Sequence, residues 1–593
     1  MIDVSAVARV TGISVEYKDL RGGAVVVLPQ QIAVFVQGSS DMVYPSTKFQ
    51  ATGYPAVGNK MGYGSPAELV AEEFFPANGD GVGTIPVHFY PLADAPGSSA
   101  AVGDITPSGT STKAQAWQVK VAGILSTQFV IPAGVVDVTA TCAKIGDAIN
   151  AVLKMPVKVT YTYGTVTTSA LVGTGNGTLT GLAVSTGVVA RPGVYTLTLK
   201  TAVTNGGVWT MRDSDNKIVA DDITQTVGVG QATPFTNKAG IDFTVTDGTT
   251  DFAVGATFTI TVPATKVILT SKWKGASANG ILLEMVGDST LGVSYALTQP
   301  AGGLVNPDVT AALAQMGGVW ETQVLNQMNI SDTQTLDKFQ TFGEGRWGQL
   351  VKKPLTVWTG NTAADVDAAT LVSDARKDDR INGQLVAPGS PNLPFVVAAR
   401  ELVAIAKMAN NSPPTDYGSQ PAKGLVGGTD GQQWDHPTKD LAVKRGSSTA
   451  DLKDNVVYLS DTVTFFHPTG DPTPAYRYAC DLEKLKNILF NLDLIFTAAE
   501  WDGAPLVPDA QVVTEPRARK PKHAKAAIAS LMDSLGKAAI ISNPEEAKKS
   551  IAANITGPKR LDCSVIVQLS GNTNIKSITL YFGFDFGAVA AAA

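Results

Sequence analysis

The C-terminal stretch from Leu561 to Phe586 constrains the fold of this chain more than any other part of the sequence. Its second half carries five apolar residues spaced two apart, and these are Ile578, Leu580, Phe582, Phe584 and Phe586. Small or polar residues separate them, so the spacing predicts a β-strand with one strongly apolar face. The first half alternates in the same way from Cys563 to Leu569. Two strands alone are marginal in water, so the pair needs a further strand or a helix to cover it.

Two arrangements satisfy this need. In the first, an upstream strand of the same chain returns to the pair and closes an ordinary C-terminal hairpin. In the second, a neighbouring molecule supplies the strand, which is β-augmentation and makes the protein a polymer subunit. The pattern by itself favours the first arrangement.

The N-terminal residues 1–24 contain no core of their own. Apolar residues recur at period two, first from Val4 to Val10 and then at Ile13, Val15 and Tyr17. Two short strand pieces followed by the hinge-like Arg21-Gly22-Gly23 are typical of an extended arm. We therefore expect an N-terminal arm that mirrors the C-terminal strand.

The next part of the chain has an α/β pattern. Strand-like runs at 32–36 and 87–90 flank a helix from Ser65 to Phe75, with Ser65 as N-cap and Pro66 in the first turn. The alternation resumes with helices expected at 308–316, 331–347, 365–377 and 394–408, and with strands at 321–327, 355–358 and 383–387. A capping-box signature opens the helix at Ser331. Residues 25–99 and 301–410 therefore form one layered, doubly wound or similar α/β domain that is split by an insertion.

The insertion has almost no helical pattern and is itself nested. Residues 156–161 and 265–270 are expected to be neighbouring strands of a β-rich domain that comprises 100–163 and 265–300. Between them, residues 164–264 contain short alternating strands separated by turns, which predicts a β-sandwich. We expect this nested domain to project outward and its two ends to lie close together, as insertion at a loop tip requires.

A C-terminal α+β domain is expected over 411–574, followed by an arm strand over 575–593. Its long helix runs from Asp481 to Glu500, with one apolar face at spacings of three and four residues formed by Leu482, Leu485, Leu489, Leu492 and Phe496. A second helix is expected from Asn543 to Gly557. The fold class is thus a multidomain α/β plus all-β chain with extended terminal strands.

Composition limits the function classes. A net charge of −6 over 593 residues does not indicate nucleic acid or a membrane as a partner. The three cysteines, Cys142, Cys480 and Cys563, lie far apart, which argues against structural zinc and for a reducing compartment or no redox pressure. We find neither a signal segment nor an apolar run that spans a bilayer, so a protein kept in a cytoplasm is expected.

No catalytic, cofactor-binding or metal-ligating residue is predicted. The sequence lacks GxSxG, GxxxxGK[ST] and a GxGxxG that opens a helix after a strand. His436 and His467 lie in Pro-containing stretches without metal-ligand partners, and we expect them on surface loops. The basic run of Arg517, Arg519, Lys520 and Lys522 lacks interleaved aromatic residues, so a protein contact is more plausible than nucleic acid. An enzyme is not supported.

Several stretches, in order along most of the chain, resemble the contractile-tail sheath proteins of bacteriophages, in the Mu-like branch. The first are Val34-Phe35-Val36-Gln37-Gly38 and Gly62-Tyr63-Gly64-Ser65-Pro66-Ala67-Glu68-Leu69. Trp273 to Gly280 is similar to the WKGxxGN turn of that branch. The remaining stretches are Arg346-Trp347-Gly348, Phe465-Phe466-His467-Pro468 and Tyr476-Arg477-Tyr478. Residues 164–264 depart from this pattern and resemble the small β-domains that decorate phage capsids and tails.

The resemblance implies a structural subunit of the virion, assembled in the host cytoplasm into a helical sheath around a tail tube. Both arms would join neighbouring subunits through shared β-sheets, and the sheath would shorten irreversibly from a metastable state. The expected partners are other copies of the chain, the tube protein, and the baseplate and tail terminator proteins. The basic run from Arg517 to Lys525 is either a contact to an acidic tube or a solvated loop with a charged face. The competing classes are a static decoration or adhesin protein and an enzyme with an unrecognised site.

Overall fold

The structure is a computed structural model that describes residues 25–471, 475–574, 576, 579 and 580. Within it, the chain forms two compact units. Unit 1 combines the described parts of Met1–Pro29, Lys407–Gly418 and Tyr478–Ala593, and unit 2 combines Gln30–Ala406 with Ser419–Arg477. The predicted fold class, a layered α/β chain with β-rich parts, is confirmed, whereas the terminal strands it includes lie almost wholly outside the described residues. Residues 419–477, grouped by sequence with the C-terminal domain, belong to unit 2.

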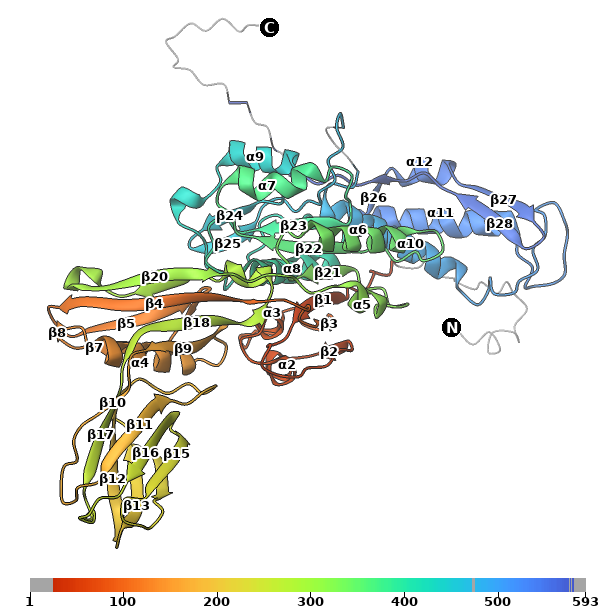
Figure 1. Cartoon of the computed structure of the whole chain (residues 1–593). Coiled ribbons are helices and arrows are strands. Elements are labelled where there is room, and N and C mark those ends of the chain that lie inside the picture. The colour runs from red at the N-terminus through yellow and green to blue at the C-terminus, as the bar shows by residue number, and fades with distance from the viewer. Residues whose placement is uncertain (1–24, 472–474, 575, 577–578, 581–593) are drawn as a thin grey trace, which may run out of the picture. The chain divides into compact units, whose positions relative to one another are not determined.

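Unit 2 is built on a six-stranded sheet of order β2-β3-β1-β21-β22-β23 (Figure 1). The strands are β1 (Ile32–Gln37), β2 (Phe49–Ala51), β3 (Val87–Leu92), β21 (Gln323–Asn326), β22 (Thr356–Asn361) and β23 (Asn382–Val386). All neighbours pair in parallel except β2 with β3. Because β1 pairs with β21, with Ile32 opposite Gln323, the segments on both sides of the insertion share one sheet. Its central strands are buried along their whole length, as parallel strands covered on both faces are.

Seven α-helices accompany this sheet along the chain: α2 (Tyr54–Met61), α3 (Pro66–Phe74), α5 (Thr310–Ala314), α6 (Thr333–Trp347), α7 (Val366–Ala375), α8 (Pro394–Asn411) and α9 (His436–Lys444). A small hairpin follows, made of β24 (Ala450–Lys453) and β25 (Val456–Leu459). The predicted cap of α3 is confirmed, since the Ser65 hydroxyl accepts a hydrogen bond from the Glu68 amide at 3.3 Å. The cap of α6 is Asp332 rather than Ser331, and its carboxylate accepts from the Thr335 amide at 3.1 Å.

The β-rich part of unit 2 contains two sheets, one α-helix and two short 3-10 helices. One sheet has the order β20-β4-β18-β9, where β4 is Ala100–Ser111, β9 is Val157–Tyr163, β18 is Ala264–Lys274 and β20 is Val293–Ala301, and β8 (Gly134–Val135) pairs with β4. The other consists of β5 (Gln115–Val121), β6 (Ile124–Leu125), β7 (Phe129–Ile131) and β19 (Leu283–Val286). The predicted pairing of β9 with β18 is confirmed. The expectation of almost no helix is wrong, because α4 (Val138–Asn150) buries Cys142, Ile145 and Ile149 at helical spacing behind an Asp137 cap.

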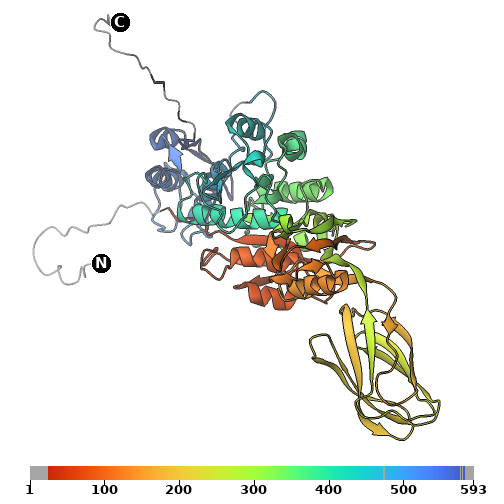
Figure 2. The same cartoon turned by 90° about the vertical axis from the view of Figure 1, so that its left-hand side faces the viewer.

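Residues 164–264 form a β-sandwich of two sheets (Figure 2). One sheet contains β10 (Thr167–Thr168), β17 (Thr257–Val262), β12 (Gly193–Val203), β13 (Gly206–Arg212) and β14 (Ile218–Thr224). The other contains β11 (Thr178–Val184), β16 (Ile241–Thr246) and β15 (Ala232–Lys238). Both sheets contribute to one core around the fully buried Trp209, and every buried residue of that core lies between Val166 and Val262. The core is therefore separate from the rest of unit 2.

Unit 1 contains α10 (Ala479–Phe496), α11 (Pro521–Lys537) and α12 (Pro544–Lys549), with the short strands β26 (Ile541–Ser542), β27 (Ala552–Gly557), β28 (Arg560–Ser564) and β29 (Gln568–Leu569). The prediction of a helix to Gly557 is wrong, because α12 ends at Lys549 and β27 instead pairs with β28. The expected strand from Cys563 to Leu569 is divided between β28 and β29. Helix α11 was missed, because the basic residues at its start were interpreted as a loop.

Helix α10 buries polar side chains. Leu482 is buried as predicted, but the other four residues of the predicted apolar face are only half-buried. Leu492 and Phe496 pack against the core of unit 1. The fully buried positions instead include Lys484, Asn487 and Asn491. A polar side of a helix is buried only where its groups find hydrogen-bond partners.

Candidate functional site

The predicted C-terminal strand lies almost entirely outside the described residues. Of its five apolar residues, only Leu580 is described, and Ile578, Phe582, Phe584 and Phe586 are not. Leu580 is 78% exposed and belongs to no strand. The last strand in the described part of the chain is β29, which pairs Leu569 with Ile541.

The five predicted residues of the N-terminal arm, Val4, Val10, Ile13, Val15 and Tyr17, also lie outside the described residues. The segment that follows them is held by α10. The Val26 amide donates to Oδ1 of Asn491 at 3.1 Å, and Nδ2 of Asn491 donates back to the Val26 carbonyl at 2.9 Å. The Leu28 amide donates to Oδ1 of Asn487 at 2.8 Å.

The segment that leads into the C-terminal arm is held by the same helix. The Lys484 ammonium donates to the Ser570 carbonyl and to Oδ1 of Asn572, both at 2.6 Å, and to Asp481 at 2.8 Å. Sequence reasoning missed Lys484, Asn487 and Asn491. Their spacing of three and four residues was visible, but the same spacing is typical of a solvated helix face.

The basic run does not form one exposed cationic surface. Arg519 pairs with Glu500 at 3.1 Å and lies over the ring of Trp501. The ammonium of the buried Lys520 donates to the Gln511 carbonyl. Arg517 and Lys522 are exposed, and the Arg517 guanidinium donates to the Asp502 carbonyl. These two residues are therefore the members of the basic run that are best placed to contact a partner.

Two sheets of unit 1 have only two strands each, β26 with β29 and β27 with β28. Within the described residues, the β27–β28 hairpin therefore has an unpaired edge on each side. Most of its residues are exposed or half-buried. An edge of this kind is a template for a further strand.

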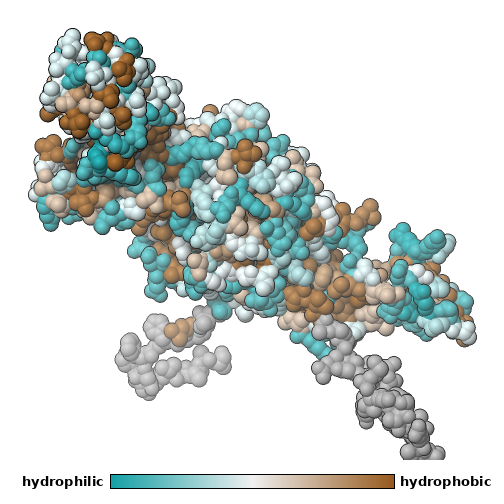
Figure 3. Space-filling view, turned by 90° about the horizontal axis from the view of Figure 1, so that it is seen from below, coloured by the Kyte–Doolittle hydropathy of each residue, from teal (hydrophilic) through white to brown (hydrophobic). Residues whose placement is uncertain are grey.

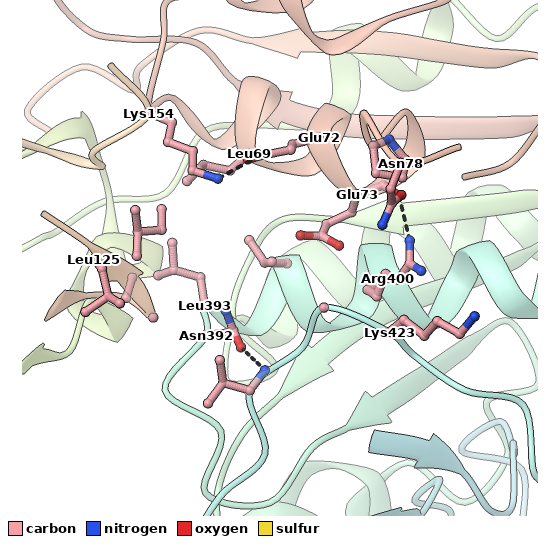
Figure 4. Close-up of a pocket in the computed structure, with 17 residues that line it drawn as sticks. Leu69, Glu72, Glu73, Asn78, Leu125, Lys154, Asn392, Leu393, Arg400 and Lys423 are labelled. Atoms are coloured by element: carbon pink, nitrogen blue, oxygen red, sulfur yellow. Dashed lines mark hydrogen bonds and ion pairs between the residues drawn. The ribbon is translucent and has the colours of Figure 1, made fainter. Parts of the chain in front are cut away.

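Unit 2 contains a cavity of about 380 Å³ between α3, the β5–β6 turn and the start of α8 (Figure 4). Leu69, Leu393 and Val396 supply apolar lining. The charged groups around it are mostly paired with each other, since Lys154 binds Glu72 at 2.7 Å and Arg400 binds Asp80 at 3.1 Å. Among the described residues that line the cavity there is no serine, threonine, cysteine or histidine.

The carboxylate of Glu73 points into this cavity. Burial raises its pKa to about 7, against the opposing effect of Arg400. In the part of the chain that the structure describes, no group of three or more His, Cys, Asp or Glu side chains could hold a metal ion. Likewise, none of the described helices is both long and apolar enough to cross a membrane.

Neither of the two histidines expected on surface loops, His436 and His467, lies on an exposed loop. His436 begins α9. His467 is only 6% exposed, which contradicts the prediction. Its Nδ1 atom lies 2.5 Å from the Phe465 carbonyl, and its Nε2 atom lies 3.4 Å from Asp374. These contacts satisfy a buried imidazole and give it a structural role.

The surface of the chain is mixed. Hydrophobic and hydrophilic residues both lie on the face seen in Figure 3, and the hydrophobic ones gather in several clusters. This agrees with a chain in which only 17% of residues are charged.

No protein-family model and no curated protein matches the sequence. Among solved structures, a sheath tail protein from Desulfitobacterium hafniense matches with a TM-score of 0.39 and 11% identity, covering 94% of this chain and 100% of that one. A sheath tail protein from Listeria innocua matches with a TM-score of 0.40 and 11% identity, covering 92% and 93%. The baseplate of the anti-feeding prophage matches with a TM-score of 0.33 and 11% identity, covering 48% and 75%. Scores this low do not establish a shared fold, so the function has to be argued from the chain's own residues.

Proposed function

We propose that this chain is a structural subunit of a contractile phage tail sheath, which polymerises helically around a tail tube. One observation carries the proposal. The sequence from Ile575 to Phe586 has the pattern of a strongly apolar strand, and Leu580, the one residue of its apolar face that the structure describes, is 78% exposed. The motifs that resemble sheath proteins, in order along the chain, support a tail sheath as the kind of polymer.

An apolar strand without a partner aggregates, so a functional protein has to pair it. Pairing between subunits supplies a partner strand, because the β27–β28 hairpin of a neighbour has edges that pair with no other described strand. Each added strand contributes about five to ten backbone hydrogen bonds, at ~0.5–1.5 kcal/mol net for each bond. Such a strand is bound strongly enough to stay paired with the neighbouring subunit while the rest of its own subunit moves.

Contraction then draws its energy from a difference between two packings of the same subunit. In this proposal the sheath assembles in a metastable extended state and shortens to drive the tube through the host envelope. The tube protein, the baseplate and the tail terminator proteins are the partners, and Arg517 and Lys522 offer positive charge to the tube. The nested domain 164–264 projects outward and takes no part in the lattice.

Truncation of either arm tests the proposal. Deletion of residues 1–20, or of 575–593, should give folded, soluble subunits that no longer form tubes in electron micrographs. Leu580→Pro should act nearly as strongly because it removes a donor in mid-strand. Leu580→Val keeps both the donor and the strand propensity, and it should still polymerise.

Tubes formed by both deletion variants would contradict the shared-sheet mechanism. An unfolded monomer from the N-terminal deletion would instead mean that this arm completes the core of its own subunit. Monodisperse particles from the intact chain would favour a static decoration protein.

A further inference from the structure

Three polar residues of α10 share one side of the helix. Asn487 and Asn491 follow Lys484 by three and seven positions, which places all three side chains in one stripe. Lys484 and Asn487 are fully buried, and Asn491 is 5% exposed. Burial of three such side chains is unfavourable unless each is hydrogen-bonded. Their partners are the two segments that lead into the terminal arms.

The N-terminal segment runs antiparallel to α10. Val26 binds Asn491, and Leu28 binds Asn487, so the residue number rises along the segment as it falls along the helix. Four helical residues advance about 6 Å along the axis, and two extended residues advance about 6.6 Å. The match of these two lengths lets a pair of asparagines bind every second residue of an extended chain.

Both asparagine amides are oriented by the helix itself. Nδ2 of Asn487 donates to the Glu483 carbonyl at 2.9 Å, and Nδ2 of Asn491 donates to the Asn487 carbonyl at 2.8 Å. This fixes each Oδ1 atom as the acceptor that faces the segment. The asparagines bind backbone atoms of Val26 and Leu28, while the Leu28 side chain is buried and Val25 packs against the core of unit 1.

Lys484 binds the segment that leads into the C-terminal arm with all of its hydrogen-bond donors. Its three donors reach three acceptors, which are Asp481, the Ser570 carbonyl and Asn572. Asn572 is itself fixed, because its Nδ2 atom donates to the Pro414 carbonyl at 2.8 Å. A buried ammonium with all three protons bonded is held far more tightly than a surface lysine.

We propose that Lys484, Asn487 and Asn491 form one clamp that anchors the roots of both terminal arms on α10, so that tension between neighbouring subunits passes through this single helix. The clamp itself follows from the contacts within one chain, and its role in tension rests on the proposed function. The two anchors lie within about 10 Å along the helix axis. A pull on one arm therefore reaches the other arm through two turns of helix.

The anchoring is tested by hydrogen exchange on the unassembled full-length subunit. The Asn487→Ala/Asn491→Ala double variant keeps helix propensity but removes the acceptors of the Val26 and Leu28 amides. Exchange at these two amides should rise by at least ~10-fold, since about one hydrogen bond is lost at each. Exchange at Ser570 should stay unchanged in this variant. Lys484→Met should leave exchange at Val26 and Leu28 unchanged. It should raise exchange at the Ser570 amide, because the hydrogen bond of that amide to the Ile540 carbonyl opens more often once Lys484 no longer holds the Ser570 carbonyl.

Ser534→Ala is the matched control. Ser534 is a buried polar residue of α11 whose hydroxyl binds the Ser530 carbonyl of its own helix, and it makes no hydrogen bond to the described residues 25–29 or 570–574. It should leave exchange at Val26, Leu28 and Ser570 at the wild-type level. Unchanged exchange at Val26 and Leu28 in the double variant would overturn the clamp, as would equal loosening of both roots by all variants including the control.

The role in tension is tested on assembled tubes. Both clamp variants should form tubes that fall apart at lower denaturant concentration than wild-type tubes, while Ser534→Ala tubes should not. Loosened roots with wild-type tube stability would overturn the transmission through α10 and leave the clamp intact. Absence of tubes from the wild-type chain would remove the proposed function, and the exchange result would still decide the clamp.

Discussion

Replacement of the nested domain by a two-residue turn tests how this chain accommodates a second core. Tyr163 of β9 pairs with Ala264 of β18, and the Gly164 amide donates to the Pro263 carbonyl at 3.0 Å. The predicted closeness of the two ends is thus confirmed. Substituting Asn-Gly for residues 164–263 leaves Tyr163 and Ala264 on either side of a type I′ turn, the favoured connection for such a hairpin.

The expected change in stability is small and can be worked out from the contacts that are lost. The ion pair between Arg191 and Asp147, at 2.9 Å, has side chains that are 31% and 50% exposed, so its loss costs at most about 1 kcal/mol. The Tyr163 hydroxyl also loses its hydrogen bond to the Ala190 carbonyl, worth about 1 kcal/mol. The buried residues of the nested core all lie within the replaced segment, and the half-buried Tyr163, which packs against that core, loses only part of its contacts because it stays in β9 beside Tyr161.

We therefore expect the remaining part of unit 2 to lose no more than about 2 kcal/mol, or at most about 8 °C in Tm. Calorimetry of the shortened chain measures this directly, and electron microscopy shows whether tubes still form. The excised segment 164–263 should also fold alone, with its own unfolding transition. Tubes should form normally, because the domain projects away from the lattice in our proposal.

Two results would refute this reasoning. A loss of folding in the shortened chain would mean that the β-rich part depends on the nested domain. A folded shortened chain that forms no tubes would mean that the domain is part of the lattice.

Two further predictions concern charge. Arg517→Glu with Lys522→Glu should weaken tube-templated assembly in low salt and have less effect in high salt, because exposed charges are screened; an unchanged assembly rate at low salt would exclude this surface, and Lys549→Glu, at an exposed site on α12, is the control. Burial raises the pKa of Glu68 to about 7 from 4.5, so the folded state keeps a proton that the unfolded state releases, and stability should fall as the pH rises from about 4.5 to 7. Glu68→Gln should reduce the difference in unfolding free energy between pH 5 and pH 8 by about 3 kcal/mol, measured by denaturant unfolding at the two pH values. Glu545→Gln, at an exposed site, should leave this difference unchanged. The same pH dependence of stability in wild type and Glu68→Gln would contradict the raised pKa of Glu68.

Local pattern predicted those elements whose side chains satisfy a simple periodicity. The alternating helices and strands of unit 2, the Ser65 cap and the pairing of β9 with β18 could all be predicted, because each depends on residues close in sequence or on an unambiguous period of two. The same reasoning identified the terminal arms as strands without a core, and that remains a prediction for the residues that the structure does not describe.

The tertiary structure decided what lies against each face. The leucines of α10 predicted an apolar core side, yet of the predicted face only Leu482 is buried, whereas the polar Lys484, Asn487 and Asn491 are all buried. Their burial is stable only because Val26, Leu28, Ser570 and Asn572 supply backbone and amide partners from both ends of the chain. Helix α12 stops early for a related reason, since the residues after Lys549 pair with β28 instead. Periodicity records which residues share a face, and only the fold brings distant partners to it.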